Sequence, residues 1–164
     1  MGREVRRVPP GWFPPKKRYL SGEDYHPQYD EAYEVAIEEW VAGREEWKTN
    51  PKSDCSYEDW YGSAPDPAYY RPNWTEEERT HFQYYSTVSE GSPLSPAFPT
   101  IEELAKYLAE HREFNADKHP SIFPIRTYEE WVRVLSAGWS PSLVISEAGI
   151  EDGATYLDRT TRKA

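Results

Sequence analysis

Residues 37–47 read IEEWVAGREEW, and the triplet Glu-Glu-Trp occurs twice in this stretch, at residues 38–40 and again at 45–47. Seven residues make nearly two turns of an α-helix, so both tryptophans face the same side of one helix. At about 100° per residue, the apolar side chains around them fall in one arc of roughly 120°. The stretch therefore predicts an amphipathic helix over residues 30–48, with Trp40 buried and the carboxylates facing solvent.

The opposite side of this predicted helix carries six carboxylates in an arc of about 140°. They are Glu31, Glu34, Glu38, Glu39, Glu45 and Glu46. Residues 21–59 hold twelve acidic residues against three basic ones, a net charge of −9, in a chain whose net charge is −10. Such a surface repels phosphate, which argues against direct binding of nucleic acid and favours a partner protein with a basic surface. The six carboxylates are therefore the first candidates for partner binding.

Three further helices are predicted from a shared start signal. Thr75, Thr100 and Thr127 each precede a glutamate by three residues, which is the spacing at which the two side chains cap one another's backbone amides. These pairs predict helices over residues 75–86, 100–112 and 127–137. The apolar positions of the last helix place Trp131 and Leu135 in the core.

Strand signals are fewer than helix signals. Residues 143–146 are β-prone, residues 151–153 read Glu-Asp-Gly, and residues 154–157 are expected to return as the second strand of a hairpin. The opening REVRRV, residues 3–8, would add an edge strand. The predicted fold class is α+β, a mainly helical single domain with a small antiparallel β element and loops rich in proline and aromatic residues.

Length and composition agree with one domain. The chain has 164 residues, of which 15% are aromatic and 15 are proline, so a few large rings can build the core while prolines interrupt the elements. Residues 1–20 hold six basic residues against Glu4, which predicts a basic, proline-rich N-terminal arm followed by one compact domain over residues 21–164. No stretch approaches the roughly eighteen apolar residues of a membrane span, and Cys55 is the single cysteine. A soluble intracellular protein without a disulfide is expected.

Catalytic signatures are absent from the sequence. There is no GxGxxG, GxxxxGK[ST] or GxSxG motif, and the four histidines lack the HExxH spacing of a zinc site. We therefore expect a non-enzymatic protein with no catalytic residues, no cofactor and no metal.

The aromatic-rich stretches YEDWYG and YYRPNW, residues 57–62 and 69–74, allow an alternative function. Their rings could stack on a nucleotide-like ligand while Arg71 or Arg79 pairs with its phosphate, or they could simply pack within the fold. The candidate ligand-binding residues of this alternative are Trp60, Tyr61, Tyr69, Tyr70, Arg71 and Trp74.

Three stretches carry a resemblance to a known group of proteins, the third being the C-terminal run from PTIEELAKYL through GWSPSLVISEAGIEDGA. MGREVRRVPPGW at residues 1–12, WYG at 60–62 and this C-terminal run at 99–154 resemble small bacteriophage- and prophage-encoded proteins that share a REVRRVP opening and a GW[AS]PS-type segment. Some members have paired cysteines that look like a zinc site, but this chain has only Cys55 in that region. The resemblance implies a genomic setting and no activity.

This setting implies the cytoplasm of a bacterial host cell and a function among proteins that act on the host. The expected function is inhibition of a host defence or nucleic-acid-processing protein, with the carboxylates of the acidic helix replacing phosphates in a basic groove. Sequestration of a nucleotide-like molecule in an aromatic pocket and a role as a virion or assembly component are the alternatives.

Overall fold

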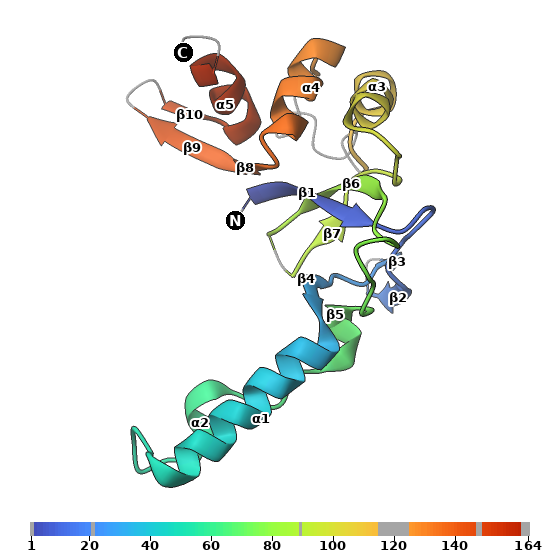
Figure 1. Ribbon diagram of the computed structural model, residues 1–164. Helices are drawn as coiled ribbons and strands as arrows, with labels where there is room; N and C mark the ends of the chain where they lie inside the picture. The colour runs from blue at the N-terminus through green and yellow to red at the C-terminus, as the bar shows by residue number, and fades with distance from the viewer. Residues whose placement is uncertain (1, 21, 89, 115–124, 147–148, 162–164) are drawn as a thin grey trace. The chain divides into compact units, whose positions relative to one another are not determined.

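The computed structural model describes residues 2–20, 22–88, 90–114, 125–146 and 149–161, and its contacts divide the chain into two compact units (Figure 1). Unit 1 comprises Met1–Pro27 and Thr75–Ala164, and unit 2 comprises Gln28–Trp74. Unit 2 is therefore inserted into the sequence of unit 1. The predicted boundary between a basic arm and a single domain at residue 20 stays a prediction.

The centre of unit 1 is a four-stranded antiparallel sheet. It contains β1 (Gly2–Val8), β6 (His81–Ser86), β7 (Ser92–Pro93) and β8 (Trp139–Pro141), in the order β7-β6-β1-β8. The opening REVRRV does form a strand, but β1 pairs with β6 on one side and with β8 on the other. It is thus an interior strand and not the predicted edge strand.

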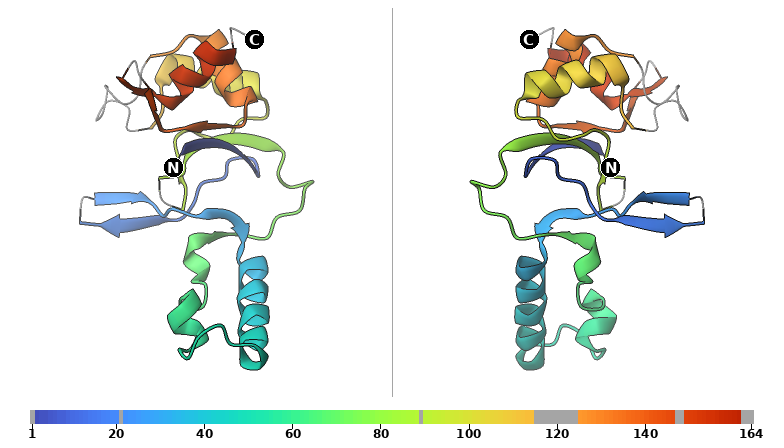
Figure 2. Two further views of the ribbon diagram at one scale, coloured as in Figure 1. Left: turned by 90° about the vertical axis from the view of Figure 1, so that its left-hand side faces the viewer. Right: turned by 90° about the vertical axis from the view of Figure 1, so that its right-hand side faces the viewer.

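Among the described residues, the helices α3 (Ile101–His111), α4 (Tyr128–Ser136) and α5 (Gly153–Thr161) cover one face of this sheet (Figures 1 and 2). The core between the layers takes Tyr84 from β6, Leu104 and Leu108 from α3, and Trp131 and Leu135 from α4. Trp131 and Leu135 are each only 1% exposed, which confirms their predicted burial.

The prediction of a mainly helical fold was wrong. Of the residues that the structure describes, 37% are helical and 27% lie in strands, which form four sheets, so the fold is a mixed α+β fold. Much of the difference lies in residues 75–86, where a helix was predicted. Thr75 N–H donates to Glu78 Oε2 at 2.8 Å and Glu78 N–H donates to Thr75 Oγ1 at 3.4 Å, yet the chain forms only a turn before β6 begins at His81.

Tertiary pairing explains this correction. The HFQYYS sequence of β6 is rich in aromatic residues, which suit a pleated, half-buried surface. β1 offers the stretch a complete hydrogen-bonding ladder, with Val5 opposite Tyr84, and Tyr84 and Tyr85 become buried there. The capping pair starts a turn but does not supply the burial that a continued helix would need.

A second correction concerns residues 143–157. The predicted antiparallel element is present as β9 (Leu143–Ser146) paired with β10 (Gly149–Asp152), but residues 154–157 lie in α5 and form no strand. Asp152 Oδ1 accepts a hydrogen bond from the Thr155 N–H at 3.0 Å, which is how an N-cap side chain satisfies a free amide of the first turn. The Asp-Gly pair therefore starts a helix and does not close a hairpin.

The other predicted starts were close. Thr100 and Thr127 are the N-caps of α3 and α4, and the Thr127–Glu130 pair forms the complete capping box. Unit 1 also contains a hairpin that the sequence analysis did not predict, formed by β2 (Lys16–Tyr19) and β3 (Gly22–Tyr25).

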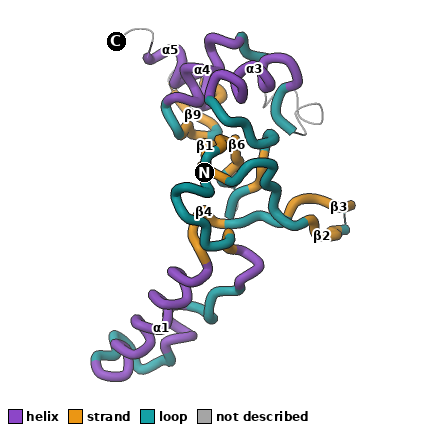
Figure 3. Tube along the Cα trace, turned by 45° about the vertical axis from the view of Figure 1, so that its right-hand side comes forward, coloured by secondary structure: helices purple, strands orange, loops and turns teal. Residues whose placement is uncertain are grey.

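Unit 2 is small, and its long helix is covered only in part. It runs from β4 (Tyr29–Ala32) through α1 (Tyr33–Thr49), α2 (Tyr57–Tyr61) and the short 3₁₀ helix η1 (Pro67–Tyr69) to β5 (Tyr70–Arg71) (Figure 3). β4 and β5 pair in parallel, and the Gln28 Nε2 amide donates to the Tyr70 carbonyl at 2.9 Å. The first and last segments of unit 2 therefore lie side by side.

Helix α1 differs from the predicted amphipathic helix in its burial. It begins at Tyr33, so Asp30 and Glu31 belong to β4. Ala36 is its only buried residue, and Trp40 is half-buried, where burial was predicted. The short α2 covers part of the helix, which leaves room for a cavity beside the indoles.

Candidate functional site

Unit 2 contains a half-open cavity of about 400 Å³ along α1, α2 and the strand pair. Its lining combines aromatic rings with carboxylates. The lining residues are Glu31, Ala36, Glu39, Trp40, Gly43, Glu46, Trp47, Asn50, Lys52, Tyr57, Tyr61 and Tyr70. We call this cavity the α1–α2 pocket.

The aromatic wall of the pocket is built around Tyr57, which opens α2 and is 6% exposed. The rings of Trp40 and Trp47 meet it edge-on, with centroids 5.5 and 5.8 Å away, and Tyr61 stacks on it at 5.1 Å. The indole N–H of Trp40 donates to the Gly62 carbonyl at 3.2 Å. These contacts hold the two indoles on one side of α1 beside the cavity.

Gly43 lets α2 approach α1 closely enough to form this wall. A Cβ atom at residue 43 would overlap the Tyr57 hydroxyl oxygen and lie 3.1 Å from the ring carbon that bears it. Glycine in the middle of a helix is unfavourable by roughly 0.5–1 kcal/mol relative to alanine. Tyr57 can therefore occupy its position only because residue 43 has no side chain.

The six predicted partner-binding carboxylates divide into two groups. At about 100° per residue, Glu34, Glu38 and Glu45 fall within about 40° of one another, whereas Glu39 and Glu46 are turned by about 110° toward the tryptophans. Glu39 and Glu46 line the pocket together with Glu31 of β4. Each Glu-Glu-Trp triplet thus presents its first carboxylate away from the pocket and lines the pocket with its second carboxylate and its indole.

The electrostatic balance of the pocket is negative. Three carboxylates and one cation, Lys52, line it. Other cations of unit 2 pair elsewhere, since Lys48 contacts Glu45 at 2.6 Å and Arg44 contacts Glu58 at 3.2 Å. Among the described residues, no ion pair involves any of the three lining carboxylates.

Tyr57 and Tyr70 of the pocket add no negative charge. Burial raises the pKa of Tyr57, with smaller contributions from Tyr61, Glu46 and Glu58. Burial likewise raises the pKa of Tyr70, followed by the effects of Glu31 and Tyr29. Both phenols therefore stay protonated at neutral pH, and the carboxylates alone set the negative charge of the site.

The alternative ligand-binding residues are only partly brought together. Tyr61 and Tyr70 line the pocket, and Trp60, 52% exposed, packs on Trp47 at 5.7 Å. Tyr69 lies at the end of η1, and Trp74 is the last residue of unit 2. None of Trp60, Tyr69, Arg71 and Trp74 lines the cavity.

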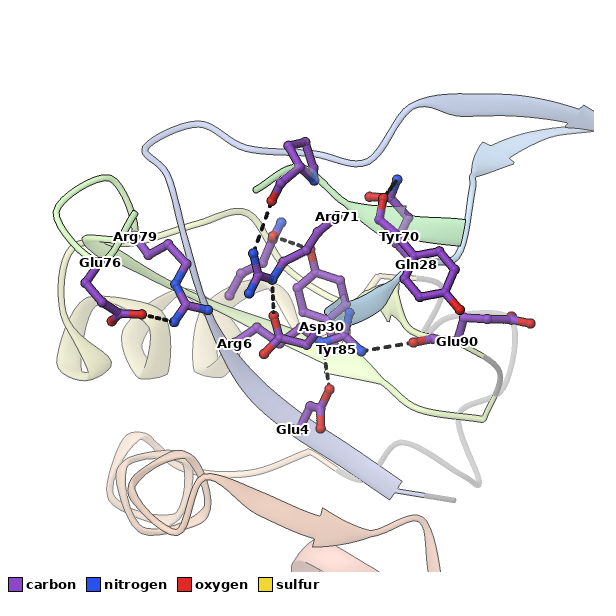
Figure 4. Close-up of polar contacts among 12 residues, drawn as sticks. Glu4, Arg6, Gln28, Asp30, Tyr70, Arg71, Glu76, Arg79, Tyr85 and Glu90 are labelled. Atoms are coloured by element: carbon purple, nitrogen blue, oxygen red, sulfur yellow. Dashed lines mark hydrogen bonds and ion pairs between the residues drawn. The ribbon is translucent and has the colours of Figure 1, made fainter. Parts of the chain in front are cut away.

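The arginines considered for a phosphate are already engaged. Arg71 Nε contacts Asp30 Oδ1 at 3.1 Å, and its guanidinium lies 5.5 Å from the centroid of the Trp74 ring. In unit 1, Arg79 pairs with Glu76. Figure 4 marks both ion pairs with dashed lines. Neither arginine is among the residues that line the α1–α2 pocket.

Sequence reasoning missed the role of Trp40, Trp47 and Tyr57, because it assigned the indoles to a core. One signal was available in Gly43, which lies between the two triplets in the middle of an otherwise helix-favouring stretch. A glycine at such a position commonly marks the close approach of another group.

The described part of the chain shows neither a metal-binding cluster nor a membrane-spanning helix. Its His, Cys, Asp and Glu side chains form no group of three or more that could hold a metal ion. None of its helices is both long enough and apolar enough to cross a membrane. Comparisons with family models, with curated proteins and with solved structures found no match to this chain.

Proposed function

We propose that unit 2 is a non-enzymatic protein-binding module whose helix α1 docks against a basic surface of a partner protein. The observation that carries this proposal is the exposure of α1, a helix of 17 residues with one buried residue. Its surface combines carboxylates with the apolar side chains of Val35 and Val41, which are 44% and 46% exposed. Exposed apolar groups rimmed by charge are typical of interaction surfaces.

The charge of unit 2 supports a basic partner. Residues 28–74 hold eleven acidic residues against four basic ones, a net charge of −7 within the −10 of the whole chain. A surface whose charges are mostly of one sign attracts an oppositely charged partner and repels partners of like charge. Glu38 and Glu45, seven residues apart on α1, are separated by about 10 Å along the helix axis.

The resemblance of residues 1–12 and 138–154 to phage and prophage proteins supports the cytoplasm of a bacterial host as the setting. In that setting, the partner is a host defence or nucleic-acid-processing protein, and α1 occupies the basic groove that otherwise meets phosphates. The protein then acts as an inhibitor by occlusion.

The nucleotide alternative has weaker support. An aromatic pocket is present, but three carboxylates and one lysine line it. A phosphate placed there would be repelled, and the guanidinium of Arg71 is held by Asp30.

The test is capture of host proteins at two salt concentrations by the parent and by Glu38→Lys/Glu45→Lys. Both residues are exposed, so the fold should be retained. At about 0.05 M salt we expect the reversed variant to bind the captured protein about tenfold or more weakly than the parent does. At about 0.5 M salt, where the Debye length is about 4 Å, the difference should shrink.

The matched control is Glu103→Lys/Glu110→Lys on α3, which reverses two exposed carboxylates at the same spacing in unit 1. This control should bind as the parent does. Equal binding by the parent and by Glu38→Lys/Glu45→Lys would contradict docking through α1.

A further inference from the structure

The two arginines of unit 2 share one mode of contact. The Arg44 guanidinium lies 5.5 Å from the centroid of the Trp40 ring and pairs with Glu58 at 3.2 Å. The Arg71 guanidinium lies 5.5 Å from the centroid of the Trp74 ring and pairs with Asp30 at 3.1 Å. In both cases an indole and a carboxylate hold one guanidinium between them.

The α1–α2 pocket places indoles beside carboxylates in the same way, and the Trp40 ring in its wall already contacts Arg44, which does not itself line the cavity. Trp47 and Glu46 are neighbours on its wall, as are Trp40 and Glu39, and no arginine is among its lining residues. The cavity of about 400 Å³ is near the lower end of the roughly 300–1,000 Å³ found for ligand pockets. It is therefore large enough for a side chain and suited by charge to a cation.

A guanidinium fits these walls better than an ammonium does. It is planar and weakly hydrated, so it stacks on an aromatic face while its N–H groups pair with a carboxylate in a fork. An ammonium is a strongly hydrated point charge that has no flat face to stack. Aromatic rings attract either cation, but the geometry of indole beside carboxylate favours arginine.

We infer that the α1–α2 pocket receives an arginine side chain of the partner protein, held between the indoles of Trp40 and Trp47 and the carboxylates of Glu39 and Glu46. The inference rests on the proposed function, because the partner supplies the arginine. It assigns the first glutamate of each triplet to long-range attraction and the second glutamate, with its indole, to recognition of one side chain.

The experiment uses three capped tripeptides, Gly-X-Gly, in which X is arginine, lysine or citrulline. Citrulline keeps the shape of arginine and replaces the charged guanidinium with a neutral urea. Each peptide is titrated into the full-length ¹⁵N-labelled protein, and the indole N–H resonances of Trp40 and Trp47 are followed. We expect the arginine peptide to shift both resonances with a dissociation constant on the order of 1 mM, the lysine peptide to bind several-fold more weakly, and the citrulline peptide to cause no shift.

The repeated triplets provide a closely matched pair of variants. Glu39→Gln/Glu46→Gln removes the two lining carboxylates, and Glu38→Gln/Glu45→Gln removes the same charge at the same seven-residue spacing from the same helix. The first variant should weaken binding of the arginine peptide about fivefold or more, and the second should change it less than about twofold. Equal losses in the two variants, or equal shifts with arginine and citrulline, would overturn the inference.

Adenosine monophosphate serves as a further probe. Shifts of the Trp40 and Trp47 resonances by this nucleotide, without shifts by the arginine peptide, would overturn the inference in favour of the nucleotide alternative. The absence of nucleotide shifts together with saturable shifts by the arginine peptide supports it.

The outcomes separate this inference from the proposed function. If partner binding is lost in Glu38→Lys/Glu45→Lys but unchanged in Glu39→Gln/Glu46→Gln, α1 docks without using the pocket, and the inference alone fails. If the arginine peptide binds the pocket but no captured protein depends on Glu38 and Glu45, the pocket assignment stands and the docking proposal fails.

Discussion

Gly43 is the residue on which the α1–α2 pocket depends most directly. Alanine usually stabilises an exposed helix interior relative to glycine by about 0.5–1 kcal/mol. Here the added Cβ atom would meet the Tyr57 hydroxyl, and Tyr57 is buried against Trp40 and Trp47. A Cβ atom at residue 43 would therefore favour the helical backbone of α1 but would clash with Tyr57 of α2.

We expect Gly43→Ala to lower the free energy of unfolding by about 1–3 kcal/mol, as overpacking generally does, despite the gain in helix propensity. Urea unfolding followed by tryptophan fluorescence measures the loss. In a Tyr57→Phe background, which removes the clashing oxygen, the same substitution should be neutral or stabilising. A stabilising effect of Gly43→Ala in the parent would show that α2 does not pack against α1 as described.

Burial was predictable for some residues and not for others. The apolar stripes correctly indicated that Trp131 and Leu135 face a core, because α4 lies on a sheet. The stripe on α1 was equally clear, yet Trp40 is half-buried. A helical period shows which side chains share a face, but how much of that face is covered depends on other segments of the chain.

At the scale of elements, a buried cluster that includes four charged residues of the described chain joins parts of unit 1 that are distant in sequence. Arg3 of β1 pairs with Asp152 of β10 at 2.7 Å and lies 3.5 Å from Glu113, which follows α3. Arg126, which precedes α4, also pairs with Asp152. Such clusters gain little net stability, but removal of one member leaves the others uncompensated.

Glu113 should make the stability of unit 1 depend on pH. Burial raises the pKa of its carboxyl group above the ordinary value of 4.5, although Arg3 and Arg126 oppose the shift, and neither carboxylate oxygen accepts a hydrogen bond from a described residue. A raised pKa in the folded state means that the folded protein binds the proton more tightly than the unfolded chain does. The contribution of Glu113 to stability is therefore greatest at low pH and declines as pH rises through the folded-state pKa.

We therefore expect the free energy of unfolding of the parent to fall, relative to that of Glu113→Gln, as pH rises from about 4 to about 7. Urea unfolding at several pH values measures this difference, and Glu110→Gln on α3 controls for loss of an exposed carboxylate. A difference between parent and Glu113→Gln that grows in the opposite direction would show that the arginines outweigh burial at this site.

Residues 75–86 and 154–157 form other elements than predicted for one physical reason. The hydrogen bonds of Thr75 with Glu78 form as the motif predicts, and Asp152 with Gly153 does change the chain direction. The element that forms after each signal depends on partners far along the chain, since β1 pairs with β6 and the Asp152 carboxylate is fixed by Arg3. The Thr75–Glu78 pair and the Asp152-Gly153 pair are each compatible with both the element that formed and the element that was predicted.

At the scale of the whole molecule, unit 2 enters and leaves through paired segments. Tyr29 of β4 lies opposite Tyr70 of β5, so the two ends of the insertion are adjacent. Insertions with adjacent ends are tolerated because the host fold keeps its own core. The core of unit 1 draws on none of residues 28–74.

We predict that replacement of residues 28–74 by a flexible linker of about six Gly and Ser residues leaves unit 1 folded. Far-UV circular dichroism would report a cooperative thermal transition. The same shortened chain with Trp131→Ala provides the control, and it should lose about 3–5 kcal/mol. Loss of cooperative unfolding in the shortened chain itself would show that unit 1 needs the insertion.

Because β1 lies in the middle of its sheet, it can pair with both neighbouring strands only late in synthesis. β1 ends at Val8, but its neighbours β6 and β8 end only at Ser86 and Pro141. At about 5–20 residues per second, the ribosome needs on the order of ten seconds to deliver the second neighbour. Unit 2 is complete in the meantime, since it ends at Trp74. The pocket-bearing insertion is therefore made in full while the first strand of its host still lacks both partners, and late pairing of this kind leaves a nascent chain open to misassembly and to chaperones.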